Sequence, residues 1–220
     1  ELSREQLEQL GRLLARMHIV GRRREARHRL RLTPATYGIQ NLEFLLSSKS
    51  LPTDLEPAYE RTVRELCEVV EPLYSGVPMQ RIHGDCHRGN IIWSGEGASL
   101  VDFDDMVVGP PVQDFWLMLS GDEEESGPQL EALLRGYEQF TDFDRSMLRL
   151  IEPLRALRFV HFSTWIARRW QDPAFQRAFP NFGNSAYWRE QLDALDEQLR
   201  VIRGVDRVQE TWSDDGWDIN

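Results

Sequence analysis

The sequence predicts an α+β fold that is mainly helical and contains one small β-hairpin. The first observation is a helical spacing of apolar residues near the N-terminus, where Leu7, Leu10 and Leu14 follow a capping box of Ser3 and Gln6. The second is a pair of short apolar runs on either side of a Ser-Gly-Glu-Gly turn. The third is a return to helical spacing after a Gly-Pro-Pro tripeptide.

Each predicted element has its own local pattern. The expected helices cover residues 3–19, 55–74, 112–119, 128–140, 143–170 with a break near Pro153, and 185–203. The expected strands cover residues 80–83, 91–93 and 99–101. The first strand enters a Gly-Asp loop, and the other two form the hairpin. Residues 206–220 are expected to form an acidic tail. No linker or repeat divides the rest, so residues 1–205 are expected to form one domain.

Size and charge exclude several classes of protein. The chain has 220 residues, of which 41% are hydrophobic, enough for one substantial core. Its formal net charge of -10 argues against nucleic-acid binding through charge alone. No apolar run reaches the roughly 18 residues that a membrane span needs, and the first residues show no signal-peptide pattern. The two cysteines, Cys67 and Cys86, lack metal-ligand spacing. We therefore expect a soluble cytoplasmic protein without membrane or nucleic-acid partners.

Two short segments carry most of the candidate chemistry, His-Gly-Asp-Cys-His-Arg-Gly-Asn at 83–90 and Val-Asp-Phe-Asp-Asp at 101–105. Phosphoryl transfer from ATP requires such a set. One carboxylate orients the acceptor hydroxyl and takes its proton, while an amide and a second carboxylate hold Mg²⁺. We predict Asp85 and Asp102 as catalytic residues, and Asn90 and Asp102 as ligands for Mg²⁺ and its bound ATP. The alternative for Asp85 alone is an Asx-turn residue.

Four nearby residues are expected to support this site. His83 and His87 are expected to hydrogen-bond the loop backbone, since no third nitrogen or sulfur ligand for zinc lies nearby in the sequence. Asp104 extends the acidic cluster, either acting through water or as a solvated loop charge. Asp114 begins a helix and is expected to accept hydrogen bonds from backbone amides of the catalytic loop. Cys86 could be considered a nucleophile, but phosphoryl transfer requires none.

The basic residues bear on function in two ways. Six arginines lie within residues 22–31, a run typical of a solvated stretch or of a surface for acidic or phosphorylated partners. With four more arginines between residues 155 and 169, they favour an acidic or phosphorylated protein as the acceptor. The only lysine, Lys49, lies in an expected loop between helices, and the chain has no Gly-rich loop. Kinases hold the ATP phosphates with a lysine on a strand and with a Gly-rich loop.

The quoted motifs resemble the aminoglycoside phosphotransferase and choline kinase family, whose signature is H-G-D-x-H-x-x-N followed by an I/V-D-x-x-D segment. That family shares the two-lobed fold of protein kinases. The resemblance therefore implies a protein-kinase-like C-terminal lobe in which the hairpin carries the catalytic loop. Further segments are similar to bacterial serine/threonine kinases of the family that act in stress responses. These segments are residues 83–93, 109–121, 151–158, 168–175 and 179–180.

The resemblance also implies cofactors and partners. It implies ATP and Mg²⁺, a protein substrate with serine or threonine hydroxyls, and a monomeric enzyme. Members of the family carry a β-rich N-terminal lobe with the adenine-binding hinge and the phosphate-binding lysine. This chain begins in what resembles the first helix of the C-terminal lobe. We therefore expect residues 1–205 to be such a lobe, and to bind ATP poorly without its N-terminal partner lobe.

Two alternative functions remain open at this point. The same signature serves kinases of small molecules, such as an amino-sugar, choline or a homoserine-like alcohol. The missing lysine also makes a non-catalytic pseudokinase scaffold conceivable. The simultaneous presence of Asp85, Asn90 and Asp102 argues against the scaffold, because a binding module does not need all three.

Overall fold

The computed structural model describes the backbone of residues 2–95, 97–119 and 123–212, and it forms two compact units. The first unit consists of Glu1–Leu32 and Gly76–Ile151, and the second of Thr33–Ser75 and Glu152–Asn220. Each unit is built from two separate stretches of the sequence, so the chain passes between them three times. The lobe expected over residues 1–205 would comprise both units and stays a prediction.

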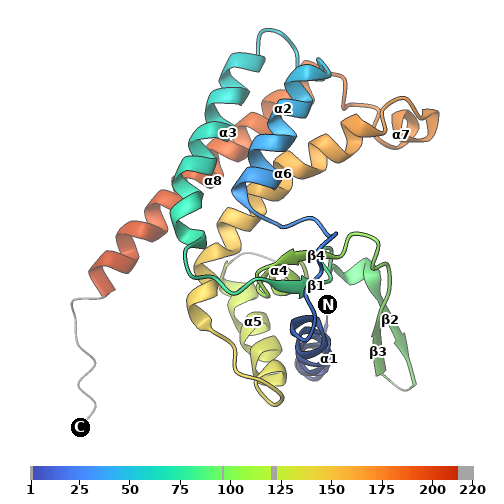
Figure 1. The fold of residues 1–220 in the computed structure, drawn as a ribbon, viewed down its shortest axis with the longest axis vertical. Helices are drawn as coiled ribbons and strands as arrows, with labels where there is room; N and C mark the ends of the chain where they lie inside the picture. Colours follow the sequence, from blue (N-terminus) through green and yellow to red (C-terminus); the bar gives the residue numbers. More distant parts are fainter. Residues whose placement is uncertain (1, 96, 120–122, 213–220) are drawn as a thin grey trace. The chain divides into compact units, whose positions relative to one another are not determined.

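Two packed helices form the base of the first unit (Figure 1), α1 (Arg4–Arg22) and α5 (Glu123–Tyr137). The predicted capping box begins α1: the Ser3 backbone N–H donates to Gln6 Oε1 at 2.8 Å, and the Gln6 N–H donates to Ser3 Oγ at 3.2 Å. The two helices can approach closely because glycine faces backbone at the contact. A Cβ on Gly11 would overlap the carbonyl oxygen of Leu133.

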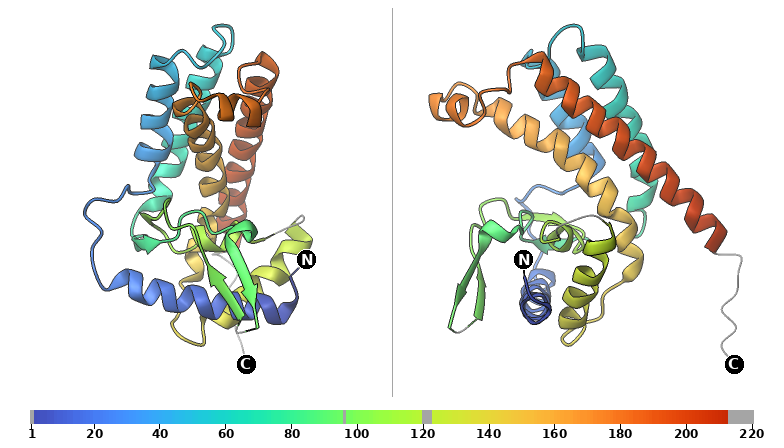
Figure 2. Two further views of the ribbon diagram at one scale, coloured as in Figure 1. Left: turned by 90° about the vertical axis from the view of Figure 1, so that its right-hand side faces the viewer. Right: turned by 180° about the vertical axis from the view of Figure 1, so that it is seen from behind.

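Two antiparallel strand pairs complete the β-structure of the first unit. β1 (Gln80–Ile82) pairs with β4 (Val107–Gly109), and β2 (Ile91–Ser94) pairs with β3 (Gly97–Leu100). Figure 2 shows the β2–β3 hairpin beside α1. The expected strand at 80–83 and the expected hairpin are confirmed. β4 was not expected, because three residues show no readable alternation and are ordered by their partners.

A short helix and a longer one follow β4 in the first unit. α4 (Gln113–Trp116) is a single turn within the expected 112–119, and α5 begins five residues before the expected start at Pro128. The 3-10 helix η4 (Arg145–Leu150) then leads into α6 (Ile151–Arg168). The break that we expected near Pro153 is this change of helix type. Pro153 itself lies in the first turn of α6, where its missing N–H has no intrahelical acceptor to lose.

All regular secondary structure in the described residues of the second unit is helical. It contains η1 (Pro34–Ile39), α2 (Gln40–Ser47), α3 (Glu56–Val70), η2 (Glu71–Tyr74), most of α6, α7 (Pro173–Ala178) and α8 (Ser185–Trp212). In its core, α3 packs along α8, and Tyr59 meets Trp188 edge to face at 5.5 Å between ring centroids. Elements η1, α2 and α7 were not expected. Lys49 lies in the loop between α2 and α3, as expected.

The last helix is longer than the sequence pattern indicated. We expected it to end at Arg203, but the backbone of α8 stays helical to Trp212. Extending an existing helix is far easier than starting one, and the single Gly204 does not stop it. The remainder of the expected acidic tail, residues 213–220, lies outside the described residues. Among the described helices, none is long and apolar enough to cross a membrane.

Candidate active site

The candidate catalytic loop begins where β1 ends, in a backbone conformation that glycine permits. Gly84 has a φ of 85°, in the left-handed region that side chains disfavour. The loop also passes close to the chain that follows the hairpin, since a Cβ on Gly84 would lie 2.6 Å from the carbonyl oxygen of Asp105. Glycine therefore allows both the turn and the close approach that present Asp85.

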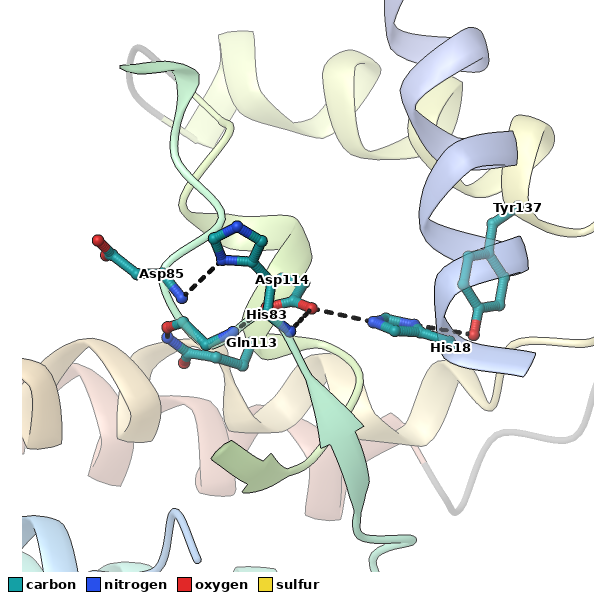
Figure 3. A network of polar contacts seen from close by, with 7 residues as sticks. His18, His83, Asp85, Gln113, Asp114 and Tyr137 are labelled. Atoms are coloured by element: carbon teal, nitrogen blue, oxygen red, sulfur yellow. Dashed lines mark hydrogen bonds and ion pairs between the residues drawn. The ribbon is translucent and has the colours of Figure 1, made fainter. Parts of the chain in front are cut away.

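A buried carboxylate holds this loop by its backbone (Figure 3). Asp114 at α4 is completely buried, and its Oδ2 accepts the His83 N–H while its Oδ1 accepts the Gly84 N–H, both at 2.8 Å. The neighbouring Gln113 donates its Nε2–H to the Gly84 carbonyl oxygen at 3.0 Å. These are the amide contacts expected of Asp114. They fix the peptide N–H groups of the two residues before Asp85, so that its side chain leaves from a fixed backbone.

A histidine that the sequence analysis did not identify completes the contacts of Asp114. His18 of α1 is also fully buried; its Nε2 lies 3.0 Å from Asp114 Oδ2, and its Nδ1 lies 3.1 Å from the Tyr137 hydroxyl. Because a carboxylate only accepts, Nε2–H donates to Asp114, and neutral Nδ1 can then accept from the hydroxyl of Tyr137. The sequence offered one signal for His18: it follows Leu14 by four residues, which places it on the apolar side of the helix.

The two loop histidines hydrogen-bond the backbone, as expected. His83 donates from Nε2 to the Val101 carbonyl oxygen at 2.9 Å, and its Nδ1 lies 3.4 Å from the Asp85 N–H. His87 accepts the Gly89 N–H at Nδ1, at 3.0 Å. The ring proton of His87 therefore belongs on Nε2, which lies 3.4 Å from Asp85 Oδ2. His83 joins the catalytic loop to the segment after the hairpin, and His87 faces the carboxylate of Asp85.

Asn90 connects Asp85 to the strand pair. Its side-chain Nδ2 donates to the Asp85 backbone carbonyl oxygen at 3.0 Å, and the backbone carbonyl oxygen of Asn90 accepts the Val101 N–H at 3.0 Å. The second contact brings Asp102, the next residue along the chain, back beside Asn90. Asp85 keeps 21% of its side chain exposed, whereas Asn90 is buried. The three residues that the sequence grouped are therefore joined through backbone contacts around one loop.

The segment after the hairpin is exposed and bends sharply at Asp102. Asp102 has a φ of 62°, which aspartate tolerates better than most side chains. The following Phe103 stacks at a tilt on His83, with ring centroids 4.6 Å apart. Asp104 is exposed, and its carbonyl oxygen accepts a hydrogen bond from Arg29 Nη1 at 3.0 Å. The described residues contain no group of three His, Cys, Asp or Glu side chains that could hold a metal by themselves.

The donor set at the loop nevertheless suits a hard cation that is shared with phosphates. Donation from Nδ2 to the backbone fixes the Asn90 amide, so Oδ1 is the atom that can act as a ligand. Asp102 contributes an exposed carboxylate one residue from the Asn90–Val101 contact. Magnesium usually takes one or two protein oxygens and completes its shell with water and phosphate oxygens. Asn90 and Asp102 fit that requirement.

Cys86 is not arranged as a nucleophile. It is fully buried, and burial, followed by the nearby carboxylates of Asp114 and Asp85, raises the pKa of its thiol well above the ordinary value. The thiolate that would attack a substrate is therefore scarce near neutral pH. The residue packs inside the loop while Asp85 reaches its surface.

The chain is similar to known phosphotransferases. Residues 1–151 match the model of the phosphotransferase enzyme family. Stress response kinase A of Escherichia coli (strain K12) is 39% identical over 200 residues, which cover 90% of this chain and 61% of that protein. The serine/threonine protein kinase RdoA of Salmonella typhimurium (strain LT2) is 36% identical over 199 residues, which cover 90% of this chain and 60% of that protein. The chain thus spans about three-fifths of the length of these relatives.

Solved structures show that the fold is shared more widely. Amicoumacin kinase hAmiN, in complex with AMP-PNP, Ca²⁺ and Ami, superposes with a TM-score of 0.62 at 19% identity, over 87% of this chain and 60% of that one. At such low identity the likeness concerns the fold alone. It confirms the expected class, a mainly helical, kinase-like fold in which small antiparallel strand pairs carry the loop.

Proposed function

The chain belongs to the phosphotransferase enzyme family, and we propose that it forms the part of an ATP-dependent protein kinase that holds the acceptor hydroxyl and the metal. The observation that carries the proposal is the fixed position of Asp85. Its two preceding peptide N–H groups are bound by the buried Asp114, and its own carbonyl oxygen accepts from Asn90. Such a backbone presents one carboxylate in a defined direction.

In the proposed reaction, Asp85 orients a serine or threonine hydroxyl and receives its proton. The oxygen of that hydroxyl forms a bond to the γ-phosphorus of ATP while the bond to ADP breaks. Positioning contributes most in such a loose transition state, so a rigid carboxylate is more useful than a strongly basic one. His87, with Nε2–H facing Asp85 Oδ2, would help to keep the carboxylate turned toward the acceptor.

Asn90 and Asp102 are the proposed ligands of Mg²⁺. When bound, the cation neutralises charge on the phosphate oxygens of ATP. The protein's own contribution is to bring one amide oxygen and one carboxylate together, which the Asn90–Val101 backbone contact supports. Asp104 would act from the same segment through water. We propose that the N-terminal lobe of the complete protein supplies the remaining contacts to ATP.

A protein acceptor is favoured by the relatives. The stress response kinase A proteins and RdoA are the more similar proteins, at 36–39% identity, and RdoA is named as a serine/threonine protein kinase. Amicoumacin kinase hAmiN is only 19% identical to this chain, and the likeness concerns the fold alone. We therefore propose serine or threonine side chains as acceptors, in a stress response of a bacterial cell.

The test is transfer of labelled γ-phosphate by the full-length protein to a serine/threonine peptide mixture, to amino-sugars and to choline, each offered separately. We expect labelled peptide, and a kcat reduced about 10³-fold in Asp85→Asn, within the range for a positioned base. Asp102→Ala should lose Mg²⁺-dependent transfer, because it removes a proposed ligand of the cation. Asp142→Asn is the matched control, because Asp142 is an exposed aspartate of the same unit.

Each alternative gives a distinct result. Label in the amino-sugar or choline but not in peptides would replace the protein acceptor by a small molecule. If wild type labels no hydroxyl acceptor and Asp102→Ala still binds its partner, the protein is a scaffold and the kinase proposal fails.

A further inference from the structure

An arginine-rich segment lies at the edge of the candidate site. We call residues 22–31 the arginine segment; it contains six arginines and one glutamate, a formal charge of +5 with His28 neutral. The whole chain carries -10, so this positive charge stands out against an acidic protein. All of its residues are exposed except Ala26. A run of like charges is often only a solvated stretch, so its position in the fold decides what it can do.

The structure ties the arginine segment to the strands around the catalytic loop. Its C-terminal end lies alongside β4: the Val108 N–H donates to the Leu30 carbonyl oxygen, and the Leu32 N–H donates to the Val108 carbonyl oxygen, both at 2.8 Å. Near the same end, Arg29 Nη1 donates to the Asp104 carbonyl oxygen at 3.0 Å. Asp104 is two residues from Asp102, and two residues span at most about 7 Å. The segment is therefore anchored close to the proposed metal ligand.

Two guanidinium groups of the arginine segment make no ion pair with the described residues. Arg27 pairs with Glu25, and Arg22 donates to the Thr141 hydroxyl. Arg23 and Arg24 are exposed, and neither makes an ion pair within the described part of the chain. Their positive charges stand close to those of their neighbours, which is unfavourable until an anion arrives.

Three of the four other arginines that the sequence analysis named make contacts of a different kind. In the second unit, Arg155 is bound to Glu152 at 2.9 Å, Arg168 lies over the ring of Phe44 at 4.0 Å, and Arg169 lies over that of Trp165 at 4.6 Å. These contacts use the guanidinium groups within the fold. The arginine segment is therefore the better candidate for recognition of an acidic partner.

We propose that the arginine segment binds acidic residues that flank the acceptor serine or threonine in the protein substrate. This inference rests on the proposed protein kinase function and narrows its substrate class. Arg23 and Arg24 lie six and five residues before the anchored Arg29. An extended peptide advances about 3.3 Å per residue, so carboxylates several positions from the acceptor can reach them. Exposed ion pairs are individually weak, so Arg23 and Arg24 together should change the KM for such a peptide about fivefold.

The experiment compares two serine peptides that differ only in their flanks, one with aspartate and glutamate and one with glutamine. The full-length protein is assayed as wild type, as Arg23→Gln/Arg24→Gln and as Arg23→Glu/Arg24→Glu. The control is Arg61→Gln/Arg177→Gln, which removes two exposed arginines of the second unit that also lack an acidic partner in the described residues. KM and kcat are measured for each peptide and for ATP.

We expect wild type and the control to prefer the acidic peptide through KM. In the Gln variant, the preference, measured as the ratio of the KM values for the two peptides, should fall about fivefold. The Glu variant should have a higher KM for the acidic peptide than for the glutamine peptide. Equal KM values for the two peptides in wild type would overturn the inference, and so would a preference that survives in the Gln variant. A change confined to the KM for ATP would assign the arginines to the nucleotide instead. If wild type labels neither peptide, the protein kinase function fails first and the inference with it.

Discussion

Replacing Asp114 by asparagine tests whether this carboxylate fixes the catalytic loop. Oδ1 accepts the Gly84 N–H, and Oδ2 accepts both the His83 N–H and the His18 Nε2–H. An amide has the same shape but only one acceptor oxygen. Whichever way it turns, its NH₂ group faces a donor that has lost its acceptor.

The magnitude follows from the number of donors affected. A hydrogen bond to a charged group contributes about 1.5–3 kcal/mol, and a buried donor left without an acceptor is costly. One or two such losses inside a fully buried site give a destabilisation of about 3–5 kcal/mol, which corresponds to a Tm lower by about 10 °C. Because the loop carries Asp85, a shift of about 1 Å there should also reduce kcat about 100-fold.

The assay is thermal unfolding by circular dichroism together with phosphoryl-transfer kinetics on full-length Asp114→Asn. The control is Asp142→Asn, which alters an exposed aspartate in the same unit and should leave Tm and kcat near wild type. Tyr137→Phe provides a milder change, since it removes only the hydroxyl that contacts His18, and should cost about 1 kcal/mol. If Asp114→Asn matched its control in both Tm and kcat, the reasoning that this carboxylate anchors the loop would be refuted.

Two further predictions concern the loop and the thiols. Gly84→Ala should lower the free energy of unfolding by about 2–3 kcal/mol in urea titrations, because φ is 85° and the new Cβ would lie 2.6 Å from the Asp105 carbonyl oxygen; a wild-type midpoint would contradict this. Burial raises the pKa of Cys67 to about 12 and that of Cys86 well above its usual range, so both thiols are protonated at pH 8. Iodoacetamide should then modify them slowly in the native protein and quickly in denaturant, as counted by mass spectrometry, whereas equal rates would show that the thiols are accessible.

Local signals in the sequence were enough to predict the elements with strong periodicity. The capping box before α1 and the turn between β2 and β3 are each determined by residues within a few positions of one another. Elements that depend on distant partners were missed. β4 has three residues, and its order comes from β1 on one side and Leu30–Leu32 on the other. η1 was missed because its Pro-Ala-Thr-Tyr-Gly stretch carries no clear apolar stripe. α2 was missed because its eight residues are too few to show a sustained helical pattern.

In the candidate site too, the sequence indicated the residues that are close along the chain and missed the one that is distant. The spacing of Asp85, Asn90 and Asp102 indicated a common loop, and the structure joins them through backbone contacts. His18 lies 96 residues before its partner Asp114, so only the three-dimensional fold relates the two. A lone histidine on an apolar helix side is more often a core residue than part of a site. Here it is a core residue that supports the site through Asp114.

The two aspartates at the loop differ in their exposure to solvent, and this difference separates their proposed roles. Asp114 is completely buried and accepts from three donors, so protonating it would break contacts that hold the loop. Asp85 keeps 21% of its side chain exposed, and its Oδ2 lies 3.4 Å from His87 Nε2. A base must be reachable by its substrate. Of the two, only Asp85 meets this condition, and Asp114 is the carboxylate that keeps the loop in place.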